Sequence, residues 1–190
     1  MTGLWLLRHG QTDWNITGRW QGQTPHAPGL NDMGRAQALA VQNQLKDVNF
    51  SAIYSSDLLR ARQTSELIAE PLGLIVALEP RLREMNLGVW EGMLSSEIEA
   101  RYPLELTERA RDPLHARAPQ GESPLEVEER VIAAVNDIAA KYQNESMLIV
   151  AHGVPLAVII CHAQGIPMDK IYEHIPENAK PYYVVWNSKG

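Results

Sequence analysis

Two histidines of this chain each stand just beyond a short apolar run and just before a glycine. His9 follows the run Leu4–Leu7 and one arginine, and His152 follows Met147–Ala151. Open α/β sheets bind ligands outside the carboxyl ends of their strands. Both imidazoles are therefore expected in one pocket, where a histidine can act as nucleophile, base or acid near neutral pH. The alternative is two unrelated surface histidines, and the residues around each of them argue against it.

Residues suited to binding an anion accompany these histidines. Arg8 offers a planar guanidinium that matches phosphate oxygens, and Asn15 and Gln21 can donate neutral hydrogen bonds to the same anion. Arg60 lies in the first turns of an expected helix that leaves a strand, and helix N-termini favour anions. Arg62 lies about 200° around that helix from Arg60. We therefore expect Arg60 to face the pocket, with Arg62 supporting it or paired on the surface.

A reaction in which a histidine acts as nucleophile also needs a proton donor for the leaving group. A carboxyl group beside the leaving-group oxygen can serve as general acid, and Glu84 is the candidate, with Glu91 as its rival. Taken alone, Glu84 would be interpreted as a solvated surface charge. The chain has neither an HExxH motif nor carboxylates at metal-ligand spacing, so we expect no metal and no other cofactor.

Strand-like and helix-like segments alternate along the chain. Strands are expected over Leu4–Leu7, Ala52–Tyr54, Leu74–Leu78, Met147–Ala151 and Tyr182–Trp186, and helices over Asp32–Leu45, 57–70, 124–142 and 154–163. This alternation predicts a three-layer α/β/α sandwich with a mostly parallel central sheet.

The boundaries of several elements follow from local signals. Ser123 begins the clearest helix start, a capping box with proline at the first helical position. Ser55 or Ser56 is expected to cap the helix over 57–70. The run Tyr182–Trp186 is expected to be an internal strand, and the alternative is an edge strand that pairs in a homodimer.

Residues 89–121 break this alternation. The segment is rich in Arg, Glu and Pro, and we interpret it as a helical or irregular excursion over the sheet edge, hence a candidate lid. With 190 residues, the chain is expected to form a single domain over 1–190 that includes this insertion.

Composition excludes several classes of partner and compartment. The net charge of −6 argues against nucleic acid and anionic membranes, although it leaves room for a small anionic substrate. The apolar runs are far shorter than the roughly 20 residues that a membrane span needs, and the N-terminus does not resemble a signal peptide. Cys161 is the only cysteine, so no internal disulfide can form and a cytoplasmic protein is expected.

Together and in this order, these motifs resemble the histidine phosphatase superfamily, also called the phosphoglycerate mutase-like family. The resemblance spans residue 4 to about residue 155. It rests on Leu7-Arg8-His9-Gly10, Trp14-Asn15, Gly18-Arg19-Trp20-Gln21-Gly22, Ser56-Asp57-Leu58-Leu59-Arg60-Ala61, Glu84 with Gly88, Trp90-Glu91-Gly92, Gly121-Glu122-Ser123 and Ala151-His152-Gly153.

The resemblance implies a mechanism that the residues themselves permit. His9 would accept the phosphoryl group as phosphohistidine, and Glu84 would protonate the leaving alcohol and then activate water. His9 must be neutral to attack, whereas His152 is expected to be protonated. The phosphoryl oxygens would be held by Arg8, Arg60 and His152, and the implied substrate-binding residues are Asn15, Gln21, Gly22, Arg62 and Gly153 through its N–H.

The implied substrate is a small phosphorylated metabolite. In this chain the segment from Glu84 to Gly121 is shorter than in glycolytic mutases, and its arginines alternate with acidic residues. This favours a phosphatase over a cofactor-dependent phosphoglycerate mutase, and a non-enzymatic phosphate-ligand binder is the further alternative. The arginines could select a second anion, as in phosphoserine or phosphoglycerate, while sugar phosphates and a cobalamin-assembly phosphate also stay open. A loop longer than usual for the family places His26 near the expected pocket mouth.

Overall fold

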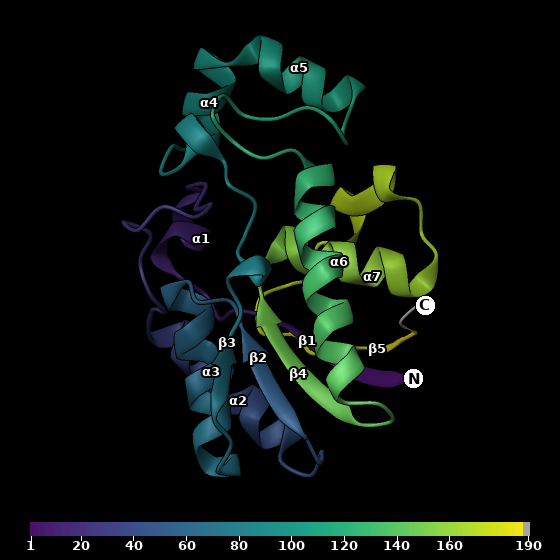
Figure 1. Ribbon diagram of the computed structural model, residues 1–190. Helices are drawn as coiled ribbons and strands as arrows, with labels where there is room; N and C mark the ends of the chain where they lie inside the picture. Colours follow the sequence, from purple (N-terminus) through teal and green to yellow (C-terminus); the bar gives the residue numbers. More distant parts are fainter. Residues whose placement is uncertain (188–190) are drawn as a thin grey trace.

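A five-stranded sheet, ordered β3-β2-β4-β1-β5, runs through the middle of the molecule (Figure 1). The computed structural model describes residues 1–187. Strands β1 to β4 pair with one another in parallel, and β5 runs antiparallel to β1, which confirms the mostly parallel sheet. The strands are β1 (Thr2–Arg8), β2 (Ala52–Ser55), β3 (Val76–Leu78), β4 (Ser146–Ala151) and β5 (Tyr182–Trp186).

Helices cover both faces of this sheet and complete the three-layer sandwich that the alternation predicts. In Figure 1, α2 (Asp32–Leu45) and α3 (Leu59–Leu72) lie on one side, and α6 (Pro124–Lys141) and α7 (Gly153–Gln164) on the other. The remaining elements are short. They are α1 (Asp13–Thr17), α4 (Ser95–Arg101), α5 (Pro103–Arg111) and the 3-10 turns η1 (Pro80–Leu82), η2 (Gly88–Trp90) and η3 (Met168–His174).

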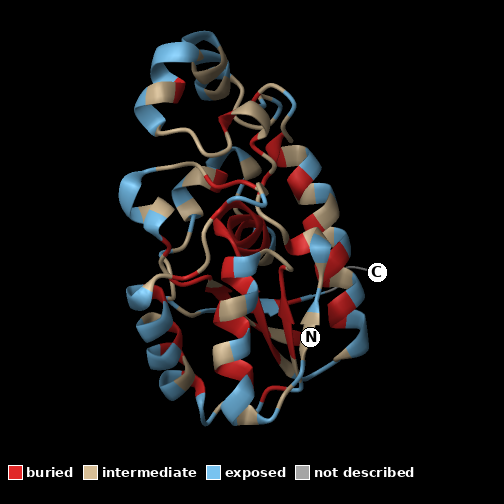
Figure 2. Cartoon of the chain, turned by 90° about the vertical axis from the view of Figure 1, so that its left-hand side faces the viewer, coloured by how far each residue is buried: buried red, intermediate tan, exposed pale blue. Residues whose placement is uncertain are grey.

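The core is divided by the sheet into two parts. Leu4 and Leu6 of β1 face the cluster under α6 and α7, whereas Leu7 joins the cluster under α2 and α3. Both faces of β1 are thus apolar, as expected for a strand covered by helices on each side. Helix α7 is buried from Gly153 through Cys161, and Figure 2 shows this helix nearly enclosed. This burial agrees with the unbroken apolar run in the sequence of the helix.

Strand β5 lies at the edge of the sheet, so the expectation that it is internal is wrong. Val184 and Trp186 are buried, while Tyr182, Tyr183 and Val185 are exposed. An edge strand can bury one face only. The apolar residues on the exposed face of β5 had suggested a strand covered on both faces.

One predicted helix cap is confirmed and the other is wrong. Ser123 caps α6 as expected, with its side chain accepting from the N–H of Glu126 and the Glu126 carboxylate returning to Ser123. Neither serine caps α3, because that helix begins later, at Leu59, after an N-cap residue without a side-chain hydrogen bond. The hydroxyl of Ser56 instead lies 2.8 Å from Nε2 of His152.

The segment 89–121 is mostly helical and lies apart from the sheet, with α4 and α5 at the top of Figure 1. It is held by aromatic contacts: the buried Trp90 ring meets Trp20 at 5.6 Å and Tyr102 at 6.1 Å between ring centroids. Its buried side chains Trp90, Ile98 and Ala118 belong to the same core cluster as those under α6 and α7. Across residues 1–187, none of the helices has the length and apolar content to cross a membrane.

Candidate active site

The register of the sheet brings the two histidines together. Arg8 pairs with Ala151 at the carboxyl ends of β1 and β4, and the next residue of each strand is a histidine. The N–H of His9 donates to the carbonyl of Ala151 at 3.1 Å, and the ring centroids of His9 and His152 lie 5.2 Å apart. Both side chains are buried. Parallel pairing therefore delivers two imidazoles from opposite ends of the chain to one point.

The hydrogen bonds of His9 select one tautomer. Its Nδ1 lies 2.8 Å from the carbonyl oxygen of Gly10, which can only accept, so the proton resides on Nδ1. On the other side, the Nε–H of Arg60 donates to Nε2 at 3.2 Å. Nε2 therefore holds a lone pair next to a cation, which is the arrangement of an imidazole nucleophile.

Two buried arginines provide the positive charge of this site. Arg60 also donates through Nη2 to the carbonyl of Gly22 at 2.9 Å, and Arg8 donates to the carbonyl of Pro176 at 3.0 Å. Among residues 1–187, no partner is found for the buried Nε of Arg8. Burial lowers the pKa of Arg60 to about 10 and lowers that of Arg8, while Glu84 opposes both shifts. Both guanidiniums stay charged at pH 7 and are available to an anion.

The pKa values of both histidines are lowered well below the ordinary value. For His9 the causes are burial, then the charges of Arg60 and Arg8, against the opposing hydrogen bond to Gly10. For His152 burial again comes first, followed by Arg60. The expectation that His152 is protonated is therefore wrong for the free site, because burial and then the charge of Arg60 lower the pKa of His152. A bound phosphoryl dianion would raise both pKa values, since an anion favours imidazolium.

These directions predict a titration result. A histidine whose pKa is lowered stays neutral down to a lower pH than an ordinary histidine. We therefore expect the rings of His9 and His152 to remain neutral at pH 6.5 in the free protein, and their pKa values to rise when vanadate or phosphate is added. Side-chain ¹H–¹⁵N NMR would measure both. A charged His152 in the free protein would contradict the prediction.

Glu84 lies against the N-terminus of α7. Its Oε2 accepts from the N–H of Gly153 at 3.0 Å, and its Oε1 accepts from Val154 at 3.2 Å and from Met85 at 2.8 Å. A helix N-terminus favours a carboxylate, because its first N–H groups have no partner within the helix. The N–H of Gly153 was expected to bind substrate, and it binds the candidate acid instead.

Arg8, His9 and Glu84 line one cavity of about 310 Å³. Arg60 and His152 are not among its lining residues and reach the site through their contacts with His9. The lining includes the predicted Asn15, Gln21 and Gly22. Asn15 uses its carbonyl oxygen to accept from Thr12, which leaves its NH₂ group as a donor. The full lining is Arg8, His9, Asn15, Arg19, Trp20, Gln21, Gly22, Glu84, Met85, Leu87, Arg109, Val154 and Ile175.

A match to a protein-family model shows which family this chain belongs to. The model of the histidine phosphatase superfamily, branch 1, matches residues 4–190. The chain belongs to the histidine phosphatase superfamily. The resemblance carried by the sequence motifs is thus confirmed.

Members of the superfamily that are similar to this chain include mutases and phosphatases. A probable phosphoglycerate mutase of Escherichia fergusonii is 37% identical over 170 residues, which cover 88% of this chain and 77% of that protein. Phosphoserine phosphatase 1 of Hydrogenobacter thermophilus is 32% identical over 179 residues, covering 94% and 84%. The structure of a mycobacterial glucosyl-3-phosphoglycerate phosphatase in complex with VO₃ has a TM-score of 0.86 and 32% identity, covering 95% and 91%.

The structure does not bring every predicted residue to the histidine phosphatase site. Arg62 points away from the cavity and pairs with Glu66 at 3.4 Å on the outer face of α3, which its angular separation from Arg60 explains. His26 is exposed and outside the cavity lining. Glu91 also lies outside the lining, and its Oε1 accepts from the N–H groups of Gln23 and Leu87.

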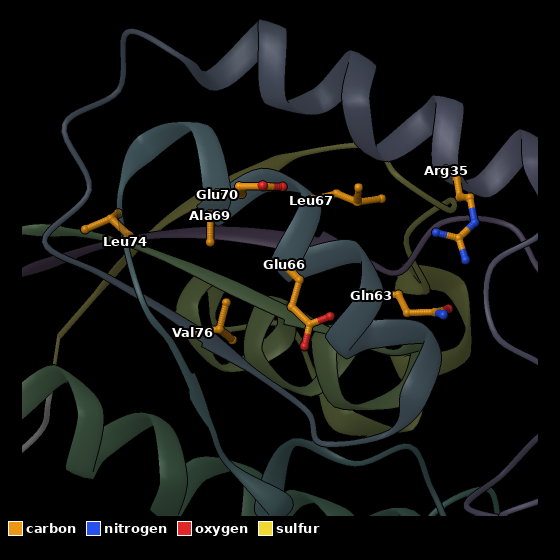
Figure 3. A pocket seen from close by; sticks show the side chains of 8 residues that line it. All are labelled: Arg35, Gln63, Glu66, Leu67, Ala69, Glu70, Leu74 and Val76. Carbon is orange, nitrogen blue, oxygen red and sulfur yellow. The ribbon is translucent and has the colours of Figure 1, made fainter.

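A larger hollow, of about 580 Å³, lies near the same outer face of α3 (Figure 3). It contains no histidine, and two carboxylates, Glu66 and Glu70, oppose the single cation Arg35. Such a lining is unsuited to a phosphoryl group, because like charges would repel it. Its lining residues are Arg35, Gln63, Glu66, Leu67, Ala69, Glu70, Leu74 and Val76.

Two further residues contribute to the site in ways that the sequence did not specify: Ser56 was expected only as a helix cap, and Arg109 only as one of several arginines that could select a second anion. Ser56 follows β2, and its N–H donates to Val150 of β4, so its hydroxyl meets His152. Arg109 of α5 lines the cavity, with its guanidinium 5.0 Å from the ring centroid of Trp20 and 4.4 Å from that of Tyr172. Ser56 stood within a recognised motif, whereas no spacing singles out Arg109 among its neighbours. Over residues 1–187, no group of three or more His, Cys, Asp or Glu side chains could hold a metal.

Proposed function

We propose that this protein hydrolyses a small phosphomonoester, without a metal ion, through a phosphohistidine formed on His9. The observation that carries the proposal is the tautomer of His9. Its Nδ1–H is bound to Gly10, its Nε2 accepts from Arg60, and the His9 ring lines a cavity together with Arg8 and Glu84. Phosphoryl transfer needs a positioned nucleophile and positive charge around the phosphoryl oxygens.

In the first step, Nε2 of His9 attacks phosphorus and the ester P–O bond breaks. Arg8, Arg60 and His152 hold the phosphoryl oxygens, and the Nε–H of Arg60 transfers its hydrogen bond from Nε2 to one of them. Glu84 gives its proton to the departing alkoxide, so the alcohol leaves neutral.

In the second step, the Glu84 carboxylate accepts a proton from water while the water oxygen attacks phosphorus. The P–N bond breaks, inorganic phosphate leaves and His9 regains its lone pair. Glu84 ends protonated, ready to serve the next substrate, so protons balance over one turnover.

We further propose a substrate with a second anionic group. The cavity volume of about 310 Å³ suits a small metabolite. Arg109 lies at its wall, with its guanidinium near the rings of Trp20 and Tyr172, and no salt bridge of Arg109 is found in the described part of the chain. Stacking leaves the N–H edge of a guanidinium free for a carboxylate or phosphate. Phosphoserine phosphatase and glucosyl-3-phosphoglycerate phosphatase among the relatives fit such a substrate.

Replacing Arg109 tests this specificity. We expect Arg109→Ala to lower kcat/KM about 10- to 100-fold for a substrate with a carboxylate, because a hydrogen bond between charged groups is lost. The value for a neutral phosphomonoester should change little. Arg111→Ala is the matched control, since Arg111 lies on the same helix and is exposed. Equal losses on both substrates would remove the specificity role.

Phosphate release from a panel of phosphomonoesters in EDTA tests the function itself. Metal-independent release from one or two compounds supports the phosphatase. The related probable phosphoglycerate mutase makes a mutase the second candidate. Conversion of 3-phosphoglycerate to the 2-isomer without net release, with or without 2,3-bisphosphoglycerate, would replace the phosphatase with the mutase. Silence in both assays would favour a phosphate-ligand binder.

Four expectations from the sequence extend the proposal. Residues 1–190 form one domain, and the segment 89–121, which carries Arg109, acts as its lid. The single cysteine, Cys161, is buried, in keeping with a cytoplasmic protein.

The exposed edge of β5 could pair with a second copy of the chain in a homodimer. Light scattering in solution tests that oligomeric state.

A further inference from the structure

The segment that carries Glu84 has no regular structure of its own. Residues 83–87 lie between the turns η1 and η2, outside the sheet and outside any helix. Their backbone carbonyls and N–H groups therefore lack the partners that a strand ladder or helix would supply. Something else must fix this stretch, because Glu84 has to stay within hydrogen-bond reach of a reacting oxygen.

Arg130, on α6, supplies those partners. Its Nη1 donates to the carbonyls of Arg81 and Arg83, each at 2.7 Å, and its Nη2 donates to the carbonyl of Glu84 at 3.0 Å. Its remaining donors reach the carboxylate of Glu122, from Nε at 2.9 Å and from Nη2 at 2.9 Å. Every N–H of this guanidinium is thus engaged, in the planar fork that only arginine provides.

Glu122 holds the same segment from its other end. Its Oε2 accepts from the N–H of Asn86 at 2.7 Å, and its own N–H donates to the carbonyl of Asn86 at 2.8 Å. The side chain of Gln23 adds a hydrogen bond to the carbonyl of Glu84 at 2.8 Å and reaches Glu122 at 3.4 Å. Two mutually paired charges therefore bind the backbone on both sides of the candidate acid.

Neither member of the pair lines the cavity that contains His9. Their side chains are mostly buried, at 18% exposure for Arg130 and 23% for Glu122. An arginine and a glutamate that lie outside the cavity lining, yet bind the backbone on both sides of Glu84, are placed to hold that segment rather than to contact substrate.

We propose that the Glu122–Arg130 pair is a positioning device for Glu84, setting where its carboxyl stands relative to the leaving-group oxygen. The inference rests on the acid role of Glu84 in the proposed function. Displacing a catalytic group by about 1 Å can cost on the order of 100-fold in rate. Loss of the pair should therefore lower proton donation while leaving phosphoryl binding by Arg8 and Arg60 intact.

The test compares an alkyl phosphate with 4-nitrophenyl phosphate. An alkoxide needs a proton to leave and a nitrophenolate does not, so a defect in positioning the acid shows as a selective loss on the alkyl ester. We expect Arg130→Gln to lower kcat/KM about 10- to 100-fold for the alkyl ester and far less for the aryl ester. Arg117→Gln is the matched control, because Arg117 pairs with Glu126 near the same end of α6 but has no bond to residues 81–86.

A double-mutant cycle separates positioning from general damage. If Arg130 acts through Glu84, adding Arg130→Gln to Glu84→Gln should cause little further loss, because the acid is already gone. A merely structural role would multiply the two losses and would lower both esters equally. Either of those results overturns the proposal.

The same cycle distinguishes failure of this inference from failure of the proposed function. Leaving-group selectivity in Glu84→Gln without any in Arg130→Gln overturns the positioning role alone. No selectivity in Glu84→Gln overturns the acid role and the positioning role with it. Should Arg130→Gln fail to fold, Arg130→Lys and Glu122→Gln carry the test, because lysine cannot span all the acceptors and glutamine cannot accept at both of its terminal atoms.

Discussion

Replacing His9 with alanine should abolish turnover of every phosphomonoester that the protein accepts. The imidazole of His9 lines the cavity, and its Nε2 holds a lone pair that accepts from the Nε–H of Arg60. Removal of the nucleophile from other covalent enzymes costs on the order of 10⁴-fold or more in kcat, and we expect a loss of that size. Phosphate release measures it. Labelled substrate should also leave an acid-labile, base-stable phosphoryl group on the parent protein and none on His9→Ala.

His26→Ala is the matched control for this substitution. His26 is exposed and outside the cavity, so the same change there should leave both turnover and labelling unaffected. The thermal unfolding of His9→Ala must be followed in parallel, because His9 is buried against His152. Retained hydrolysis, or a label that survives in His9→Ala, would show that another group accepts the phosphoryl.

The nucleophile could be predicted from the sequence because strand periodicity and topology suffice to place it. A buried run followed by His-Gly, once near each end of the chain, puts both imidazoles at the carboxyl edge of a parallel sheet. The pairing of Arg8 with Ala151 confirms that reasoning. Helical geometry likewise separated Arg60, which is buried, from Arg62, which faces solvent.

Other features depend on contacts that no sequence spacing reports. Glu84 was recognised by its motif, but its bonds to the N-terminus of α7 arise only when that helix is placed against residues 83–87. Arg130 lies on an ordinary amphipathic helix, and nothing in its position along the chain indicates carbonyl partners near residue 84. The protonation of His152 was mispredicted for a related reason, because burial beside Arg60 outweighs the general expectation for a phosphate-binding histidine.

The site therefore combines groups of two kinds. Those that touch the phosphoryl follow strand ends and helix starts, where topology dictates the position. Those that hold the acid are side chains whose partners are backbone atoms of an irregular segment, and such segments have many possible courses. Residues of the first kind are easier to predict from the sequence than residues of the second, because hydrophobic periodicity indicates only regular helices and strands.

Replacing Glu84 with glutamine should separate the two halves of the reaction. The value of kcat/KM reports the steps through phosphorylation of His9, so we expect it to fall about 10²- to 10⁴-fold for an alkyl phosphate. The same value should change little for 4-nitrophenyl phosphate, whose leaving group needs no proton. Water activation also requires Glu84, so the aryl ester should give a burst of nitrophenol followed by slow turnover, with phosphohistidine accumulating. Rapid-quench measurement of the labelled protein would detect it.

Glu91→Gln serves as the control for this substitution. The hydrogen bonds of Glu91 fall on its Oε1 alone, so an amide can keep them, whereas Glu84 accepts at both oxygens and loses one set. Stability of the two variants must therefore be compared before their rates. Glu91→Gln should show no leaving-group selectivity and no burst. If Glu84→Gln instead slows both esters equally and Glu91→Gln shows the selective loss, the acid is Glu91, and residues 83–87 serve only to shape the cavity.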